Sequence, residues 1–284
     1  MRIRVVVDST ADMTAETAAK VKIVPLTVRF GEREYISGVE IDSGKFYEML
    51  VESDELPTTS QASPFAFGEA FAEAVAAGDM VVCLTCSGKL SGTYQSAVIA
   101  AEEYPGRVYV VDSQTIAIGL GILVEYALEL RDRGLSGEEM VRKLLRKREK
   151  VQLLAMVDTL EYLKKGGRIS ATAALAGGIL NIKPVITLSG GEIKVLGKAR
   201  GSRQANNLLV QEIGKAGGVD FSKPLMLGYT GLSDALLQKY IADSAALWEG
   251  KREVLPVSIV GSVVGTHVGP GAVAVAFFSA DEEE

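Results

Sequence analysis

Two short segments rich in hydroxyl groups each stand directly before a predicted helix. The first, SGKLSGTY at residues 87–94, follows an apolar strand predicted over residues 80–84. Glycine and hydroxyl residues at a strand-to-helix connection present free backbone N–H groups and the positive end of a helix dipole. Ligands of open α/β sheets bind beyond the carboxyl ends of the strands, where this loop is expected. The sequence therefore predicts an anion site here, the alternative being a capped loop without a ligand.

The spacing within this loop excludes two common motifs. A nucleotide-binding P-loop has a glycine five residues before its Gly-Lys pair, which Gly88-Lys89 lacks. The nucleophile elbow of hydrolases has the spacing G-x-S-x-G, whereas Ser91 lies three residues after Gly88.

The second hydroxyl-rich segment is PTTSQASP at residues 57–64, which contains Thr59 and Ser60. Alone, such residues are ordinary caps and turns. If the two segments converge, however, they supply several neutral hydrogen-bond donors to one anion.

The one histidine, His267, stands in the glycine-rich sequence VGTHVGPG at residues 264–271. One interpretation is a buried, hydrogen-bonded histidine. The surrounding glycines favour close approach of the backbone to a ligand or another chain. A Ser91–His267–Asp triad stays open as a third interpretation, although no acid is recognisably positioned for it.

Cations gather in two further places. Arg168, in KKGGRIS at residues 164–170, could pair with an acid, stabilise packing between domains or reach a ligand anion. Lys198, Arg200 and Arg203 form a basic patch that is either a solvated surface or a docking site for an acidic or phosphorylated partner.

A predicted helix at residues 171–180, ATAALAGGIL, has small residues where a core helix would carry larger ones. Small side chains permit close packing or leave a slot for another molecule. An apolar slot that ends in hydroxyl donors suits an amphiphile with an anionic head.

Composition narrows the function classes. The chain has 284 residues, 48% of them hydrophobic, and a net charge of −6, which together exclude a disordered chain and argue against broad nucleic-acid binding. No apolar run reaches the roughly 18 residues of a membrane helix. Cys83 and Cys86 are expected to be buried strand thiols, with a redox role left open, and no metal site or cofactor is expected. A cytoplasmic location is expected.

The order of predicted elements indicates two α/β domains. Over residues 1–150 strands and helices alternate, which predicts a parallel sheet with helices on both faces, a three-layer α/β/α domain. Over residues 151–284 a hairpin and further strands predict a mixed sheet in a two-layer α/β domain. Besides residues 171–180, the predicted helices lie at 46–51, 64–77, 93–103, 119–133, 136–148, 159–165, 202–216 and 233–248, and the predicted strands include 3–7, 23–30, 107–111, 184–188 and 193–197. Residues 8–10 are expected to cap a first helix that begins near Met13, and Ser63 and Ser136 are expected to cap the helices that follow them.

Six segments, in order along the chain, resemble motifs of the DegV family, the fatty-acid-binding subunits of bacterial fatty acid kinase. They are VDSTAD at 7–12, LPTTSQ at 56–61, SGKLSGTY at 87–94, VVDS at 110–113, KGGRI at 165–169 and THVGPG at 266–271. Each alone is moderately specific, and six in register make the resemblance highly specific.

The resemblance implies a fatty acid in the cleft between the two domains, with its carboxylate on Thr59 and Ser91. Ser60, Gly92 and Thr93 belong to the same two motifs and are expected at the ligand. Arg168 and His267 match family residues near the head group. Arg200 and Arg203 resemble a basic pair that docks the kinase.

The resemblance also implies that the chain is a lipid-binding subunit without catalysis of its own. It would present the carboxylate to a separate fatty acid kinase for phosphorylation to acyl phosphate, with transient membrane contact for lipid exchange and no nucleic-acid partner. An acyl chain of about fifteen carbons gains roughly 12 kcal/mol gross on leaving water, and its buried carboxylate then needs hydrogen-bond donors. The alternative is an enzyme that uses His267 on a small polar carbonyl or ester substrate.

Overall fold

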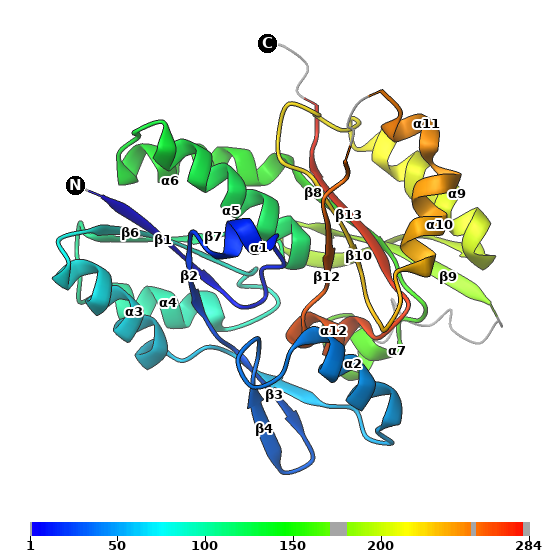
Figure 1. The fold of residues 1–284 in the computed structure, drawn as a ribbon, viewed down its shortest axis with the longest axis horizontal. Helices are drawn as coiled ribbons and strands as arrows, with labels where there is room; N and C mark the ends of the chain where they lie inside the picture. The colour runs from blue at the N-terminus through cyan, green and yellow to red at the C-terminus, as the bar shows by residue number, and fades with distance from the viewer. Residues whose placement is uncertain (1, 171–180, 251–253, 281–284) are drawn as a thin grey trace.

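The computed structural model describes residues 2–170, 181–250 and 254–280. These residues form two large β-sheets and one small one, with helices packed against them (Figure 1). The predicted helix at residues 171–180 lies outside the described residues.

The N-terminal half contains a parallel four-stranded sheet in the order β2-β1-β6-β7. Its strands are β1 (Ile3–Asp8), β2 (Lys22–Val24), β6 (Met80–Thr85) and β7 (Val108–Asp112). Apolar runs such as the three valines of β1 suit a sheet that is covered on both faces. Val5 and Val7 pack toward α5 and α6, whereas Val6 packs toward α3 and α4. This arrangement confirms the predicted three-layer α/β/α domain.

Helix ends in this half follow their capping residues. The helices are α1 (Ala15–Ala18), α2 (Ser43–Glu52), α3 (Pro64–Ala76), α4 (Thr93–Ala101), α5 (Ala117–Asp132) and α6 (Gly137–Lys147). Ser63 accepts a hydrogen bond from the backbone of Ala66, with Pro64 in the first turn of α3. Ser136 and Glu139 form a capping box at α6. The expectation that residues 8–10 cap the first helix is wrong, because Thr14 caps α1.

A small antiparallel sheet, in the order β4-β3-β5, was not expected from the sequence. Its strands are β3 (Thr27–Phe30), β4 (Arg33–Ile36) and β5 (Thr58–Ser60). The strand predicted over 23–30 is divided at Pro25, which lacks the N–H that a continuous ladder needs. The residues before Pro25 pair with β1, and those after it pair with β4 and β5. The hydroxyl-rich segment at residues 57–64 thereby forms an edge strand.

The C-terminal half contains a mixed six-stranded sheet in the order β10-β9-β8-β13-β11-β12. Its strands are β8 (Val151–Met156), β9 (Ile182–Ser189), β10 (Glu192–Arg200), β11 (Met226–Tyr229), β12 (Val257–Ile259) and β13 (Val273–Phe278). The helices are α7 (Glu161–Lys165), α9 (Gly201–Lys215), α10 (Ala235–Asp243), α11 (Ala245–Trp248) and α12 (Ser262–Val268), with a 3-10 turn at Arg148–Lys150. The helix predicted over 233–248 is divided at Ser244, whose hydroxyl donates to the Tyr240 carbonyl oxygen.

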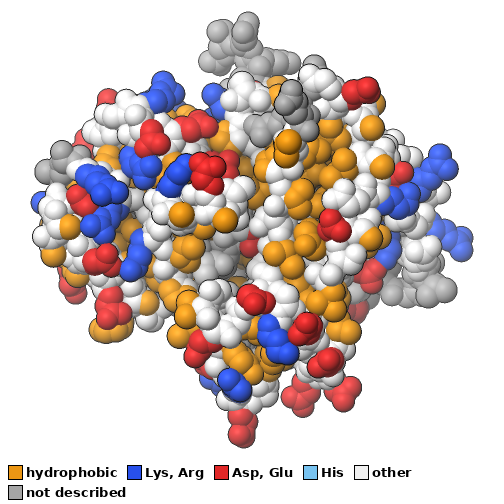
Figure 2. All heavy atoms as spheres, viewed as in Figure 1, with side chains coloured by type: hydrophobic (Ala, Val, Ile, Leu, Met, Phe, Trp, Pro, Cys, Tyr) orange, Lys and Arg blue, Asp and Glu red, His pale blue; other side chains and the backbone are white. Residues whose placement is uncertain are grey.

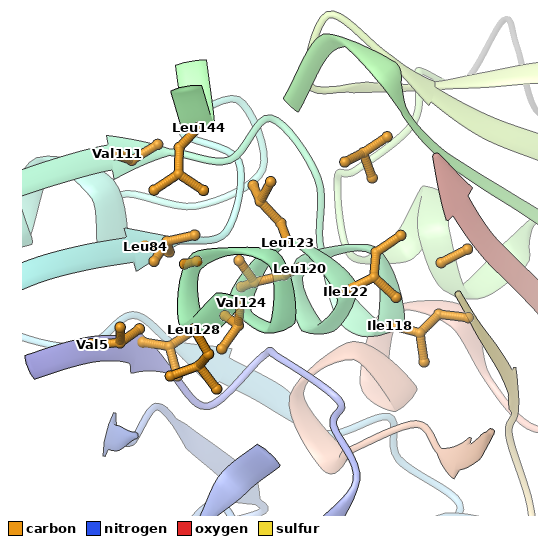
Figure 3. Close-up of a cluster of buried hydrophobic side chains, with 14 of the residues drawn as sticks. Val5, Leu84, Val111, Ile118, Leu120, Ile122, Leu123, Val124, Leu128 and Leu144 are labelled. Atoms are coloured by element: carbon orange, nitrogen blue, oxygen red, sulfur yellow. The ribbon is translucent and has the colours of Figure 1, made fainter. Parts of the chain in front are cut away.

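The two large sheets share one hydrophobic core because α5 lies between them (Figures 1 and 3). Residues 117–124 of this helix are all buried, which is typical of a helix enclosed on every side. In Figure 3, Leu128 lies on the side of Val5, and Ile118 lies toward the C-terminal strands. The division at residues 150 and 151 stays a prediction, since the packed core extends across it.

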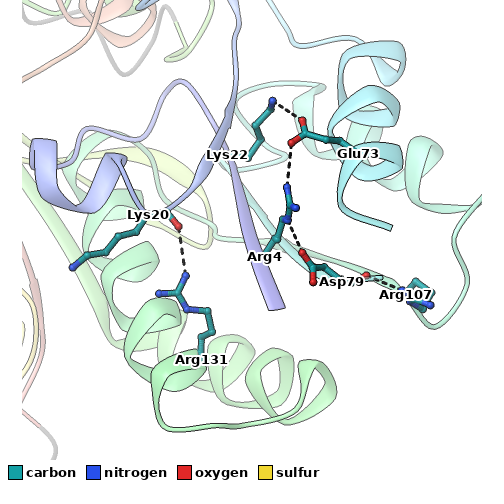
Figure 4. A network of polar contacts seen from close by, with 7 residues as sticks. All are labelled: Arg4, Lys20, Lys22, Glu73, Asp79, Arg107 and Arg131. Atoms are coloured by element: carbon teal, nitrogen blue, oxygen red, sulfur yellow. Dashed lines mark hydrogen bonds and ion pairs between the residues drawn. The ribbon is translucent and has the colours of Figure 1, made fainter. Parts of the chain in front are cut away.

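Polar contacts join the opposite ends of the parallel strands, away from the hydroxyl-rich loops (Figure 4). Arg4 on β1 donates to Asp79 (2.7 Å) and Glu73 (3.1 Å), and Lys22 on β2 donates to Glu73 (2.9 Å). The Arg107 side chain donates to the Asp79 carbonyl oxygen at 2.9 Å. These contacts link β1, β2 and the residues directly before β6 and β7 to α3, at the end of the sheet that carries no candidate ligand residues.

On the face seen in Figure 2, acidic and basic side chains are interspersed, with apolar side chains exposed between them. Among the described helices, none has the length and apolar character needed to cross a membrane.

We predict that Leu128→Ala lowers the free energy of unfolding by about 2–5 kcal/mol, because it empties space in the shared core. The single tryptophan, Trp248, is buried on the far face of the C-terminal sheet. Trp248 fluorescence and far-UV circular dichroism should shift together in urea, with half-exposed Leu145→Ala as the matched control. A shift in circular dichroism alone would show that the halves unfold separately.

Candidate functional site

A cavity lies where the two halves meet. Apolar side chains make up about half of its lining, and we call it the polar cavity for the hydrogen-bonding side chains among the rest. Its volume is about 170 Å³. Its polar lining includes Thr59, Gln61, Ser91, Arg168 and His267. Thr59 and Gln61 come from the β5 region and Ser91 from the loop after β6, whereas Arg168 and His267 belong to the C-terminal half. The two hydroxyl-rich segments therefore converge, as the sequence analysis required of an anion site.

An apolar cavity of about 60 Å³ adjoins the polar one. Its lining is mainly alanine, valine, leucine and isoleucine from the C-terminal sheet, α12 and the start of α5. Four apolar side chains line both cavities: Ile116, Ile193, Val264 and Val268. The site thus has one end that is rich in hydrogen-bonding groups and one end that is apolar.

Asp8 organises the loops that line the polar cavity, a role that the sequence analysis missed. The carboxylate is fully buried at the end of β1. Its Oδ1 accepts from the Thr10 hydroxyl (2.6 Å) and backbone (2.9 Å), and its Oδ2 accepts from the Cys86 backbone (2.6 Å). Burial raises the pKa of Asp8, and these hydrogen bonds oppose the rise. Thr10 and Cys86 both line the cavity, so Asp8 fixes the positions of two lining residues that come from different loops.

The loop between β6 and α4 holds Ser91 in place. The Ser91 and Thr93 hydroxyls are 2.9 Å apart, and the Thr93 backbone donates to Ser91 Oγ at 3.2 Å. Gly92 lines the cavity, and a β-carbon at this position would collide with the Gln61 side chain. Gln61 in turn donates to the Ser96 hydroxyl at 3.0 Å. A glycine at position 92 therefore leaves room for the Gln61 side chain to reach Ser96 on α4.

His267 lies on α12, a helix that the sequence analysis did not predict. Its Nε2 is 2.9 Å from Thr59 Oγ1. The glycines around it predicted close approach to a ligand or another chain, whereas the close approach here is to the chain's own aromatic side chains. A β-carbon at Gly265 would collide with Phe46 and Tyr47, and one at Gly269 would collide with Tyr162. These glycines lower the helix propensity of the segment, but because they have no side chain they allow α12 to lie against α2 and α7.

Three further hydrogen bonds attach α12 and the segment before it to the N-terminal half. The Tyr47 hydroxyl donates to the Val260 carbonyl oxygen at 3.0 Å. The hydroxyls of Ser37 and Ser262 are 2.9 Å apart. The Gly261 backbone donates to Asp12 Oδ1 at 2.8 Å. These contacts fix the position of His267 relative to Thr59.

His267 is neutral near pH 7. Burial, with a smaller contribution from the nearby Arg168 cation, lowers its pKa to about 4. Its Nδ1 is buried and has no hydrogen-bond partner within the described part of the chain. The Arg168 side chain is itself held by the carbonyl oxygens of Leu90 (3.1 Å) and Gly166 (2.6 Å).

Other expected site residues lie outside the cavity lining. Ser60 is exposed, because successive residues of β5 point to opposite faces. Thr93 is fully buried and contacts Ser91. Arg200 and Arg203 are exposed at the end of β10 and in the first turn of α9, and neither lines the two cavities.

Cys83 and Cys86 are free, buried thiols, as predicted, but only Cys83 lies on a strand, because β6 ends at Thr85, one residue before Cys86. Burial raises the pKa of both well above the usual value for a thiol. Within residues 2–170, 181–250 and 254–280, no group of three or more histidine, cysteine or acidic side chains is placed to hold a metal ion.

We predict that His267→Asn changes how stability depends on pH. The folded pKa of about 4 lies below the ordinary 6.5, so the unfolded state binds the proton first as the pH falls. Between pH 6.5 and pH 4, the free energy of unfolding of the wild type should fall by up to roughly 3 kcal/mol relative to that of the variant. Urea unfolding at a series of pH values measures this difference.

Asp12, whose pKa burial raises to about 7, acts in the opposite direction. The stability that protonated Asp12 contributes is lost as the pH rises through 7. Asp12 is present in both proteins, so its contribution cancels in the comparison. A difference between wild type and His267→Asn that does not vary with pH would contradict a neutral, buried His267.

Comparisons with known proteins agree with this geometry. A family model described as "Uncharacterised protein, DegV family" matches residues 2–280. A DegV domain-containing protein of Deinococcus radiodurans is 38% identical over 283 residues, covering 97% of this chain and 98% of the relative.

Two solved structures are closely similar to this one. A DegV family protein from Thermus thermophilus, described for its fatty acid binding, has a TM-score of 0.87 and 35% identity, covering 99% of this chain and 100% of that protein. A stearic acid-binding protein from Eubacterium ventriosum has a TM-score of 0.86 and 30% identity over 97% of each chain. These matches confirm the two-domain α/β fold and the resemblance found in the six sequence motifs. The chain belongs to the DegV family.

Proposed function

We propose that this chain binds a long-chain fatty acid, with the carboxylate in the polar cavity and the acyl chain in the apolar cavity. The observation that carries the proposal is the adjacency of these cavities across four shared apolar side chains. The binding of fatty acids by similar DegV proteins supports it.

Neighbouring groups orient the two hydroxyls toward a carboxylate. If the proton of neutral His267 lies on Nε2, it donates to Thr59 Oγ1 and leaves the Thr59 proton for the ligand. In this tautomer the buried Nδ1 carries no proton, so the atom without a partner is an acceptor and not a donor. Ser91 Oγ accepts from the Thr93 backbone, and when the Thr93 hydroxyl also donates to it, the Ser91 proton is available to the ligand. Two hydroxyl donors and the nearby Arg168 cation then offset the cost of burying the anion.

The acyl chain needs more space than the two cavities now provide. Their volumes of about 170 and 60 Å³ lie below the roughly 300 Å³ at the low end of ligand pockets. The shared side chains, Ile116 among them, must therefore change rotamer to join the cavities. Ile116 lies in a segment where Gln114 and Ala117 both have a φ of 55°, a strained backbone for residues other than glycine. Each methylene that enters gains about 0.8 kcal/mol.

We propose further that the bound carboxylate is presented to a separate fatty acid kinase, which phosphorylates it to acyl phosphate. In this account the chain binds and orients the substrate and transfers no group itself. Exposed Arg200 and Arg203 are the proposed docking residues for an acidic surface of the kinase. Their separation from the cavities suits residues that contact a partner and not the lipid.

The alternative function, an enzyme that uses His267 as a base, finds less support. Thr59 and His267 have the spacing of a nucleophile and its base, but catalytic histidines are oriented by a third group on the other ring nitrogen. No such group contacts Nδ1 within the described residues. A small polar substrate would also leave the apolar cavity unused.

We expect Thr59→Val and Ser91→Ala each to weaken fatty acid binding at least about tenfold, because each removes a hydrogen bond to a charged group. Titration calorimetry with palmitate measures the affinity. Ser60→Ala, on the exposed neighbour of Thr59, is the matched control and should bind as the wild type does. Unchanged affinity in both Thr59→Val and Ser91→Ala would remove the carboxylate from this cavity.

We expect Ala274→Met, which fills the apolar cavity, to weaken binding of palmitate by about tenfold or more while sparing a ten-carbon acid. The short acid serves as the internal control for folding, and both affinities come from the same calorimetric assay. Equal losses for the two acids would place the acyl chain elsewhere.

A further inference from the structure

Resting on the proposed function, we propose that a cleft outside the polar cavity is a binding site for a phosphoryl group, which holds the phosphate of the acyl phosphate. This outer cleft is lined by Lys89, Leu90, Arg168, Glu192, Ile193 and Lys194, among others, and has a volume of about 620 Å³. It is more open to solvent than the polar cavity.

The outer cleft continues directly from the polar cavity. Leu90, Arg168 and Ile193 line both spaces. In the transfer, a carboxylate oxygen forms a bond to the γ-phosphorus of a nucleoside triphosphate while the bond to the diphosphate breaks. The new phosphoryl group therefore lies outward of the carboxylate. With the acyl chain in the apolar cavity and the carboxylate at Thr59 and Ser91, the space on the outward side is this cleft.

The charges of the cleft suit a phosphoryl dianion. Lys89, Arg168 and Lys194 contribute three positive charges and Glu192 one negative charge, on a chain whose net charge is −6. Glu192 pairs with Lys194 at 2.9 Å, and the two lysines lower its pKa. The cleft therefore carries a local positive surplus on an acidic protein, which favours an anion there.

The cations come from both halves, and hydrogen bonds between the halves bring them together, including the one from Arg168 to the Leu90 carbonyl oxygen. Lys89 belongs to the loop after β6, whereas Glu192 and Lys194 lie on β10. The Ser87 hydroxyl donates to the Gly191 carbonyl oxygen at 2.7 Å, which joins this loop to the β9–β10 hairpin. A β-carbon at Gly191 would collide with that hydroxyl, and Gly191 has a φ of 82°, so glycine is required for the contact.

The test compares two ligands that have the same hydrocarbon chain, one without and one with a phosphoryl-like group. Palmitate is the first, and the second is 2-oxoheptadecylphosphonate, in which a methylene replaces the labile bridging oxygen of palmitoyl phosphate. In titration calorimetry at low salt, the double variant K89M/K194M should bind the phosphonate about tenfold or more weakly and palmitate within about twofold of the wild type. Lys45→Met, an exposed lysine of α2 outside the cavities, is the matched control and should change neither affinity.

A variant that removes a negative charge from the cleft gives a second test, because it should change phosphonate affinity in the opposite direction. Glu192→Gln removes the one carboxylate of the cleft and should strengthen phosphonate binding without a change for palmitate. If palmitate binds all proteins and the phosphonate affinity is the same in wild type and K89M/K194M, the phosphoryl site is overturned while fatty acid binding stands. If the wild type binds no palmitate, the proposed function itself fails.

Discussion

The hydrogen bond between Thr59 and His267 is the interaction on which the site depends, because it joins the two halves of the chain at the polar cavity. Thr59 lies on a short edge strand and His267 on a short, glycine-containing helix, and neither element would hold a fixed position alone. Contacts from Asp12, Ser37 and Tyr47 fix α12 against the N-terminal half. The geometry of the head-group site is therefore a property of the interface between the halves.

The same interface separates hydrogen-bonding groups from apolar surface. Helix α5 fills most of the space between the two large sheets, and the cavities remain beside its first turn, near Ile116 and Ala117. Toward the loops after β1 and β6 the lining provides hydroxyl groups, and toward the C-terminal sheet it provides only apolar surface. A molecule that satisfies both ends has one anionic group and a hydrocarbon chain.

Features encoded locally in the sequence were predicted well. Capping residues such as Ser63 and Ser136 mark helix starts, and the apolar run of β6 marks a buried parallel strand. Features set by distant contacts were not predicted. Helix α12 has a poor helix sequence and is stabilised by packing on Tyr47, which is far away in the chain. Asp8 was expected to cap a helix. Its contact with Cys86 could not be predicted, because it depends on the pairing of β1 with β6, which are far apart in the sequence.

The most direct measurement is native mass spectrometry of the purified chain, followed by organic extraction and identification of whatever it carries. We predict one molecule of a fatty acid of about 14–18 carbons per chain in the wild type, a length at which the gain of about 0.8 kcal/mol per methylene outweighs the cost of association. A chain that retains no lipid, and that stays unliganded when palmitate is added in excess, would contradict the account.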